Sequence, residues 1–318
     1  MSYKSPKWNN GSAPPLSAEN MQALTDAVQE QGETLATMCN PNMLDNWYFG
    51  NPINQRGQTS YTGGVYGIDR WLKSAAETTV AVVTGGISAS GKQFQRLEQR
   101  VEDAQSLNGI TVTFSALVKN PNGNFRLALY NATTGGLITQ DFQASEDFQL
   151  VQITAAPVIN AGDVFSVALY PGANNATTER TCLIKAVKLE LGSQQTLAHQ
   201  ENGAWVLNEI PKFGDQLAAC QRCAVRLSKW SQIRAASIEQ NTIDFSVPIP
   251  TSMRAVPVLV DVSKFIVRTV SGNAQDGFSL TTLGGSESVV LVRATKTSHG
   301  LADAQLYIED GAMFSADL

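Results

Sequence analysis

The stretch that decides the fold is residues 110–130, which read ITVTFSALVKNPNGNFRLALY. Apolar residues alternate with polar or small ones on both sides of the tetrapeptide NPNG at 120–123. Successive side chains of a β-strand point to opposite faces, and Asn, Pro and Gly favour tight turns. The segment therefore predicts two strands joined by a short turn, each with one face in a core.

The alternation returns before residue 200. Phe165, Val167 and Leu169 alternate with polar or small residues after the turn NAGD at 160–163, and a further strand is expected over 183–191. No helical window separates these strands, and Gly, Asn and Pro mark the turns between them. The pattern indicates an antiparallel β-sandwich.

A second all-β run follows one helix, which is expected near 214–228. In this run Ile243, Phe245 and Val247 alternate with polar residues and with prolines. Because proline has no N–H to donate to a central ladder, this part is expected at a sheet edge or a strand end. Further strands are expected over 256–262, 288–294 and 305–309.

The composition excludes several classes of function. Only 16% of the 318 residues are charged, the formal net charge is −5, and no basic cluster stands out, so binding to nucleic acid is disfavoured. No apolar run reaches the roughly 18 residues that span a bilayer, and residues 1–10 are polar. Neither membrane insertion nor a signal peptide is therefore expected.

Cysteine and histidine are too scarce to predict a cofactor. Cys220 and Cys223 form a C-x-x-C, which could be half a zinc site or a redox pair, but a closed zinc site needs four ligands. The remaining cysteines and the two histidines are isolated, so we interpret the thiols as buried small hydrophobes and expect neither metal nor cofactor. Three oxygen-bearing residues remain candidates for a structural calcium ion: Asp45, Asn46 and Glu190.

The sequence GISASGK at 86–92 matches the G-x-x-x-x-G-K pattern of a phosphate-binding loop. The next residue, Gln93, lacks the hydroxyl that such a loop offers to Mg²⁺, and no alternating strand and helix pattern surrounds it. We interpret the segment as a Gly/Ser hairpin loop. No catalytic motif is found elsewhere, so the chain is not expected to be an enzyme, although carboxylates that only the fold brings together would be invisible here.

The N-terminal part predicts an extended arm followed by one helix. Residues 1–15 are rich in Asn, Gly, Ser and Pro, and Ser17 is a suitable N-cap. The helix carries a short coiled-coil seam with 3-4-3-4-3 spacing: Met21, Leu24, Val28, Gln31, Leu35 and Met38. Because a lone helix is marginal in water, this seam must pack on copies of itself or on the chain's own body. We favour self-association.

Aromatic residues are densest between Trp47 and Trp71. Planar side chains with a polar tip suit stacking on sugar rings, which makes Tyr61 and Tyr66, in a Gly-rich loop, candidates for exposed glycan contacts. Trp47 and Tyr48 are further candidates. The alternative is that these rings fill the core of the first sandwich, and we favour that interpretation for Trp71.

Several segments resemble one family. They are NMLDNWYF at 42–49, NPINQRGQ at 51–58, GIDRW at 67–71, FQRLE at 94–98, GITVTFS at 109–115, VKLELG at 187–192, QLAACQR at 216–222, PIPTSMRAVP at 248–257, SADL at 315–318 and APPLSAEN at 13–20. Together they resemble tail-fibre and receptor-binding proteins of phages and prophages of gut bacteria, whose body is a jelly roll like a carbohydrate-binding module.

The resemblance implies a mainly β architecture and a domain order. Residues 1–40 are expected to form the attachment arm and oligomerisation helix, 41–193 an antiparallel jelly-roll sandwich, 194–228 a linker and helix, and 229–318 a second small β-sandwich. It also implies that 94–101 is a strand, whereas the spacing of Phe94, Leu97 and Val101 by itself suggests a helix. We follow the resemblance here.

The resemblance also implies a function. We expect a virion structural protein, made in the bacterial cytoplasm, that forms a homotrimer through its helix. Its arm would join other tail or baseplate proteins, and its β-domains would recognise a host cell-surface polysaccharide. Two alternatives stay open. The chain could be a collar or spacer that binds no ligand, or a tail-associated glycan depolymerase with a carboxylate pair.

Overall fold

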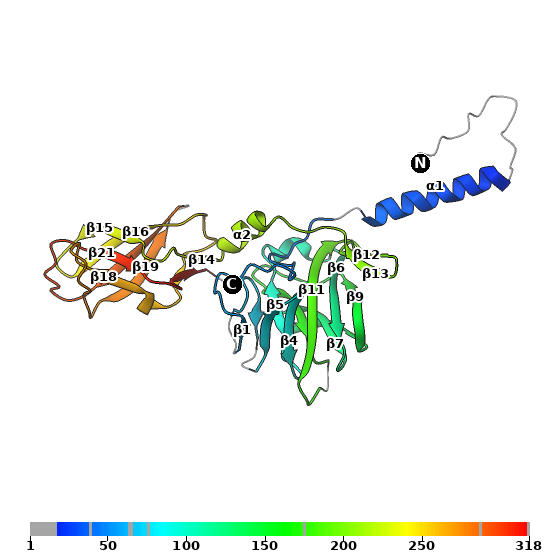
Figure 1. Cartoon of the computed structure of the whole chain (residues 1–318), viewed down its shortest axis with the longest axis horizontal. Helices are drawn as coiled ribbons and strands as arrows, with labels where there is room; N and C mark the ends of the chain where they lie inside the picture. Colours follow the sequence, from blue (N-terminus) through cyan, green and yellow to red (C-terminus); the bar gives the residue numbers. More distant parts are fainter. Residues whose placement is uncertain are drawn as a thin grey trace, which may run out of the picture.

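The structure is a computed structural model that describes residues 18–37, 40–62, 66–74, 77–173, 176–285 and 288–316, without the side chains of 29–37. The molecule is elongated, with a helix at one end, a large β-sandwich in the middle and a smaller β unit at the other end (Figure 1). The prediction of a mainly β, antiparallel architecture with an N-terminal helix is confirmed.

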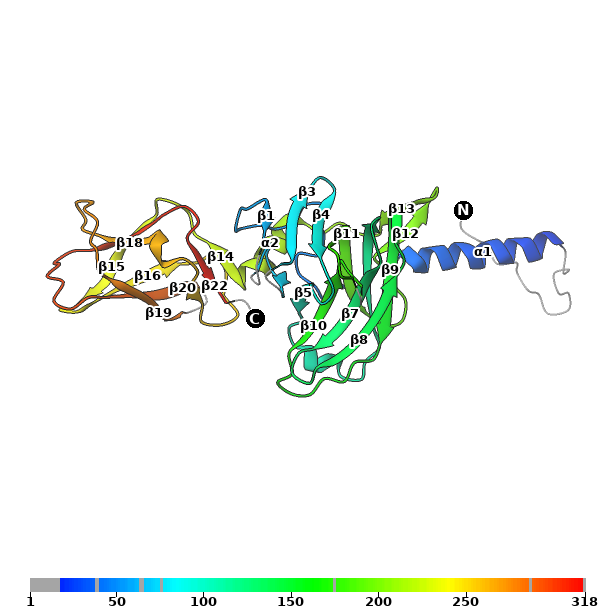
Figure 2. The ribbon, with the colours of Figure 1, turned by 90° about the horizontal axis from the view of Figure 1, so that it is seen from below.

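Two α-helices are present in the described part of the chain. Helix α1, Ala18–Thr37, begins directly after the predicted N-cap and points away from the sandwich (Figure 2). Helix α2, Phe213–Gln221, ends earlier than predicted because the chain then enters strand β14, Ala224–Arg226, which pairs with the strand at the C-terminus. No helix among the described residues is long and apolar enough to cross a membrane.

One sheet of the large sandwich has six antiparallel strands in the order β1-β3-β4-β11-β6-β9. Their bounds, in that order, are Ser60–Tyr61, Thr79–Val83, Gly86–Gly91, Arg180–Leu191, Val112–Asn120 and Ser145–Ala155. The expected strands at 110–119 and 183–191 are β6 and β11, which are neighbours in the interior of this sheet, and almost every residue of β6 is buried.

The second sheet has five antiparallel strands in the order β2-β5-β10-β7-β8. Their bounds, in that order, are Leu72–Lys73, Leu97–Arg100, Phe165–Tyr170, Phe125–Asn131 and Gly136–Phe142. The core between the sheets contains Phe114, Phe125 and Leu127, and the rings of Phe49 and Trp71 meet edge to face at 5.3 Å. The core position expected for Trp71 is confirmed.

Two local predictions are corrected by this sandwich. The segment at 86–91 is strand β4, paired on both sides, and is neither a phosphate-binding loop nor a hairpin loop, because Ile87 and Ala89 alternate into the core. The strand predicted over 94–101 is confirmed only over 97–100, which is strand β5; the helical spacing was misleading, and Phe94 lies in a turn. A small hairpin, β12 (Ala198–Glu201) and β13 (Ala204–Leu207), follows the sandwich.

The smaller β unit is a half-barrel with its own core around Phe245, Leu306 and Phe314. Its six-stranded sheet has the order β18-β21-β15-β16-β20-β19, with bounds Phe265–Arg268, Gln305–Ile308, Gln232–Ile238, Thr242–Pro248, Val289–Thr295 and Ser279–Gly285. A three-stranded sheet, β14-β22-β17, completes it with β22 at Met313–Ser315 and β17 at Val258–Leu259. Pro248 ends a strand and Pro257 precedes an edge strand, as predicted.

Direct contacts join the two β units. Gln55 of the large sandwich donates to the Ala224 carbonyl at 2.7 Å, and Arg226 donates to the Gln55 carbonyl at 3.2 Å. Glu102 lies among three guanidinium groups, those of Arg70, Arg222 and Arg254, at 3.4, 3.2 and 3.7 Å. The units are thus held together by a partly exposed polar junction rather than by a free linker.

Candidate functional site

The outer face of the five-stranded sheet carries the most chemically organised surface of the large sandwich. Leu97, Leu127 and Leu169 point into the core, one from each of three strands. The residues next to each leucine in its own strand therefore point outward. The strand register sorts these outward residues into three rows across the sheet. The first row is Arg100, Ser166, Tyr130 and Leu137; the second is Glu98, Ala168, Ala128 and Thr139; the third is Tyr170, Arg126 and Asp141.

The middle row has the smallest side chains of the three, and we call the strip formed by the three rows the trough. Ala128 and Ala168 are buried and pack with Tyr170 in an apolar cluster of their own, separate from the main core. Small side chains in the middle row leave the flanking rows higher, because Tyr and Arg extend farther from the sheet than Ala. The trough therefore crosses the strands, but its floor is covered, because Ala128 and Ala168 are 0% exposed and Tyr170 is 6% exposed.

Arg96 spans the trough at its β5 side. Its guanidinium lies over the rings of Tyr130 and Tyr170, at 4.8 and 6.0 Å from their centroids, and it pairs with Glu98 at 2.6 Å. Burial lowers the pKa of Arg96, but the charge of Glu98, its hydrogen bond and the two tyrosines together outweigh burial, so the pKa of Arg96 is raised. Such cation–π contacts hold both tyrosine rings in fixed orientations.

The far end of the trough lies over β8. Arg126 donates through Nε and Nη2 to the two oxygens of Asp141, which fixes a charged pair at the rim. Burial raises the pKa of Tyr170, which keeps its hydroxyl protonated and available as a hydrogen-bond donor. Thr139 and Leu137 are exposed here, with Leu137 49% exposed. The exposed part of this strip is therefore its β8 side, with the half-buried Tyr130 beside it.

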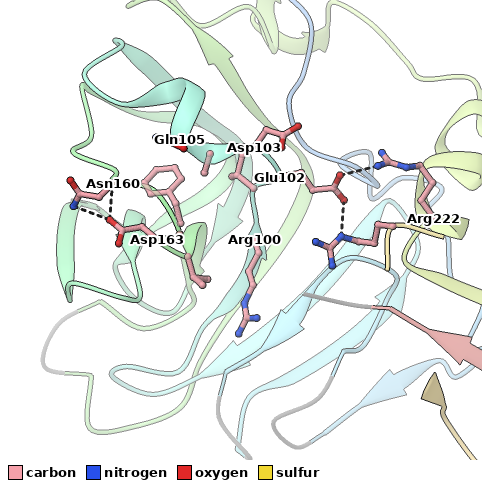
Figure 3. Close-up of a pocket in the computed structure, with 13 residues that line it drawn as sticks. Arg100, Glu102, Asp103, Gln105, Asn160, Asp163 and Arg222 are labelled. Atoms are coloured by element: carbon pink, nitrogen blue, oxygen red, sulfur yellow. Dashed lines mark hydrogen bonds and ion pairs between the residues drawn. The ribbon is translucent and has the colours of Figure 1, made fainter. Parts of the chain in front are cut away.

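A polar pocket of about 480 Å³ lies where Arg100 leaves this face. Figure 3 shows Glu102 pointing to the arginines of the junction, while the Arg100 side chain points away from them. On the other side Asp163 accepts from Asn160 and Asn131, and these hydrogen bonds lower its pKa. The pocket is thus walled by the junction on one side and by the loop before β10 on the other.

The aromatic residues that the sequence suggested as glycan contacts do not lie on this face of the sheet. Trp47 and Tyr61 are 3% and 4% exposed, so the expected exposure of Tyr61 is wrong: its ring packs under Gly67 and its hydroxyl donates to Asn54. Tyr48 and Tyr66 are half-buried, one bridged to Ala186 in the six-stranded sheet and the other to Leu72 in the five-stranded sheet. The four are not gathered into one site, and a glycan contact by any of them stays a prediction.

The functional candidates that sequence reasoning missed are Tyr130 and Tyr170. Both stand on the outer side of an alternating strand, away from the main core, and Tyr170 packs there on Ala128 and Ala168. The alternation that puts these tyrosines on the outer side of their strands can be read from the sequence. Their proximity cannot, because it depends on the pairing of β7 with β10.

The residues that the sequence suggested for metal or redox chemistry make other contacts in the structure. Asp45 pairs with Arg70 at 3.0 Å, whereas both oxygens of Glu190 accept from Thr196. Within the ranges that the structure describes, no group of three His, Cys, Asp or Glu residues could hold a metal ion. Cys182, Cys220 and Cys223 are buried, as interpreted, and form no disulfide within the described residues, and burial raises the pKa of Cys182 to about 12. Cys39 lies outside the described residues.

Comparisons with known proteins give fold likeness only. No family model matches the chain, and no curated protein matches it. Among solved structures, a CBM4 carbohydrate-binding module is 18% identical over 46% of this chain and 99% of its own, with a TM-score of 0.32. A module named TmCBM61, solved with β-1,4-galactotriose, is 13% identical over 48% of this chain and 99% of its own, with a TM-score of 0.29.

A tailspike protein of bacteriophage CBA120 is 12% identical over 47% of this chain, with a TM-score of 0.28, and the match spans 21% of the tailspike domain. Each of these matches covers about half of this chain.

Proposed function

We propose that this chain is a tail-fibre or receptor-binding protein of a phage or prophage virion, which recognises a bacterial surface polysaccharide and acts as a homotrimer. The observation that carries the glycan part is the trough on the five-stranded sheet, with Tyr130 and Tyr170 held by Arg96 above a floor of alanines. A sugar ring presents C–H groups on its faces and hydroxyls at its edge. Tyrosine rings match the faces, and Arg and carboxylate pairs match the hydroxyls.

The virion part rests on the sequence resemblance and on helix α1. Met21, Leu24 and Val28 are 49%, 48% and 61% exposed, so the chain's own body does not cover the first half of the seam. An apolar seam on a projecting helix supports association with copies of itself. The side chains of Gln31 and Leu35, the whole of Met38 and the arm at 1–17 lie outside the described residues. The arm is proposed to join the tail or baseplate.

We propose binding without hydrolysis. The two carboxylates of the trough belong to β5 and β8, which are three strand spacings apart in the sheet. At about 4.8 Å per spacing this separates their backbones by about 14 Å. Glycoside hydrolases of the common types hold two carboxyl groups about 5 to 9.5 Å apart. Each of the two, Glu98 and Asp141, is instead paired with an arginine.

One observation favours the alternative of a spacer that binds no ligand. Arg96 already lies over both tyrosine rings, so the protein satisfies much of the trough with its own side chain. A ligand then has to stack on the outer side of these groups or displace the guanidinium. The binding experiment below decides between the two functions.

Replacing Tyr130 with alanine is expected to weaken polysaccharide binding about tenfold, since a lost stacking contact and its buried area are worth about 1.4 kcal/mol. The measurement is isothermal titration calorimetry with surface polysaccharide purified from bacteria that the protein binds. Tyr307→Ala is the matched control, because Tyr307 also carries an arginine, Arg268, over its ring at 3.6 Å but lies on the smaller β unit. Equal affinities of the wild type and Tyr130→Ala for the polysaccharide would show that the trough is not the binding site.

A further inference from the structure

Trp230 differs from its neighbours on the smaller β unit because its indole is left in solvent. It is 68% exposed, whereas Trp47 and Trp71 of the large sandwich are 3% and 0% exposed. Single exposed Leu or Val residues are normal on a protein surface, but tryptophan is highly buried on average. An indole in this position adds little to the core of the unit.

The backbone holds Trp230 in a conformation that a bulky residue disfavours. It is the third residue of the turn 228–231 between β14 and β15, in which the Ser231 N–H donates to the Ser228 carbonyl at 3.4 Å. Its φ is 66°, in the left-handed region where turns favour glycine or asparagine. The Trp230 N–H donates to the Ile308 carbonyl at 2.7 Å, which fixes the turn against β21. A glycine would fit this turn better, so the fold does not require the indole.

Charged side chains lie beside the exposed ring. The Lys229 ammonium is over the indole, 4.8 Å from its centroid. Asp310, in the turn that follows β21, pairs with Arg226 at 2.7 Å. The pKa of Asp310 is lowered, mainly because Arg226 donates to it and also because Arg226 and Lys229 carry positive charge nearby. An indole that is 68% exposed with an ammonium over one face has its other face in solvent.

Exposure and a left-handed backbone do not by themselves make a site. Phe94 of the large sandwich is 67% exposed and has a φ of 65°, nearly the same values as Trp230. Its phenyl ring, however, offers no hydrogen bond. Trp230 differs in the N–H of its indole and in the charged groups of Lys229 and Asp310 around it.

We propose that Trp230 is a stacking platform for a sugar ring, so that the smaller β unit carries a second subsite for the polysaccharide. The inference rests on the proposed function and names a contact that the trough does not include. The C–H face of a pyranose would lie on the open face of the indole, which Lys229 holds in place from the other side. The indole N–H and Asp310 would bond hydroxyls at the edge of the sugar.

The surroundings favour a sugar over a protein partner. A tryptophan that anchors a protein interface lies in a well-packed pocket from which neighbouring contacts exclude water. The neighbours of Trp230 are charged instead, and the side chains of Arg226 and Asp310 are 36% and 62% exposed. A ligand rich in hydroxyls can replace the water around such groups with hydrogen bonds of its own.

A second subsite on the smaller β unit adds affinity for a polymer in particular. The contacts of Gln55 with Ala224 and Arg226 hold this unit against the large sandwich, so the two subsites keep a fixed separation. A polysaccharide repeats its unit, and one polymer can therefore contact both the trough and Trp230. The second contact is then intramolecular, which strengthens binding through effective concentration.

The test uses the full chain with Trp230→Gly. We expect its affinity for surface polysaccharide, purified from bacteria that the protein binds, to fall about tenfold in isothermal titration calorimetry. Its melting temperature is expected to be no lower than that of the wild type, because glycine adopts the left-handed turn without strain. Phe94→Gly is the matched control, since it relieves the same backbone conformation at an equally exposed ring. It is expected to keep the wild-type affinity.

Tryptophan fluorescence tests the same contact directly. The polysaccharide is expected to protect the wild type from quenching by acrylamide, and to protect Trp230→Phe much less, although that variant keeps a ring for stacking and part of the affinity. A wild type that binds the polysaccharide without this protection, together with an unchanged affinity of Trp230→Gly, would overturn the subsite and leave the proposed function standing. A wild type that does not bind the polysaccharide would overturn the glycan part of the proposed function, and this subsite with it.

Discussion

Replacing Leu24 and Val28 with aspartate is expected to convert the trimer into monomers, so that the mass in solution falls from three times 34.2 kDa to 34.2 kDa. In the proposed seam, carboxylates at these positions would have to leave water at the helix contact of three subunits. An unpaired charge in such a contact costs several kcal/mol.

Gln22→Asp with Gln29→Asp is the matched control, because these residues are seven positions apart and belong to the outer side of the same heptads. The control is expected to stay trimeric. Size-exclusion chromatography with light scattering measures both masses. An aspartate pair at Leu24 and Val28 that keeps the wild-type mass would contradict the seam.

Replacing Lys73 with methionine is expected to stabilise the fold by about 2 kcal/mol near pH 7. Lys73 is fully buried in strand β2 beside Leu97, and in the described part of the chain its Nζ has no hydrogen-bond partner. Burial lowers its pKa from 10.5 to about 8. Methionine keeps the unbranched shape and removes the amine.

The sign of the pH dependence follows from this shift. In the unfolded chain Lys73 binds its proton up to about pH 10.4, but in the folded protein it loses it near 8. The lysine therefore costs stability below pH 8, and that cost fades as pH rises from 8 toward 10. We expect the difference in unfolding free energy between Lys73→Met and wild type to be largest at pH 6 and to shrink by pH 9.5.

Urea unfolding at the two pH values measures this difference. Lys92→Met is the control, since the Lys92 side chain is 49% exposed and its replacement is expected to change stability by less than about 0.5 kcal/mol. A destabilised Lys73→Met, or a difference that grows with pH, would show that the amine is solvated or paired in the folded protein.

The strands with clear alternation were the predictable part of the fold. Residues 110–130 indicated two strands, and the structure has β6 and β7 there. The edge strand β8, Gly136–Phe142, was not predicted because nearly all of its residues are exposed, so its two faces show no apolar contrast. Strand β4 was misread because Gly and Ser dominate its sequence, although its paired neighbours bury it on both sides.

The candidate site was less predictable than the fold. Local aromatic density pointed to Trp47 and Tyr61, but loops that close over a sandwich need large side chains to seal its core, and both residues do that. The trough depends on register, which places Tyr130 opposite Ser166 and Tyr170 opposite Arg126. Contacts between residues about 40 positions apart have no local signature in the chain.

A crystal structure with bound oligosaccharide tests the central claim most directly. The oligosaccharide is prepared from the surface polysaccharide of a strain that the protein binds. We predict a sugar ring in the trough, above Ala128 and Thr139 and in contact with Tyr130, with hydroxyls bonded to the Arg126 and Asp141 pair. A sugar bound at the loop around Tyr66, or on the smaller β unit with the trough empty, would contradict the account.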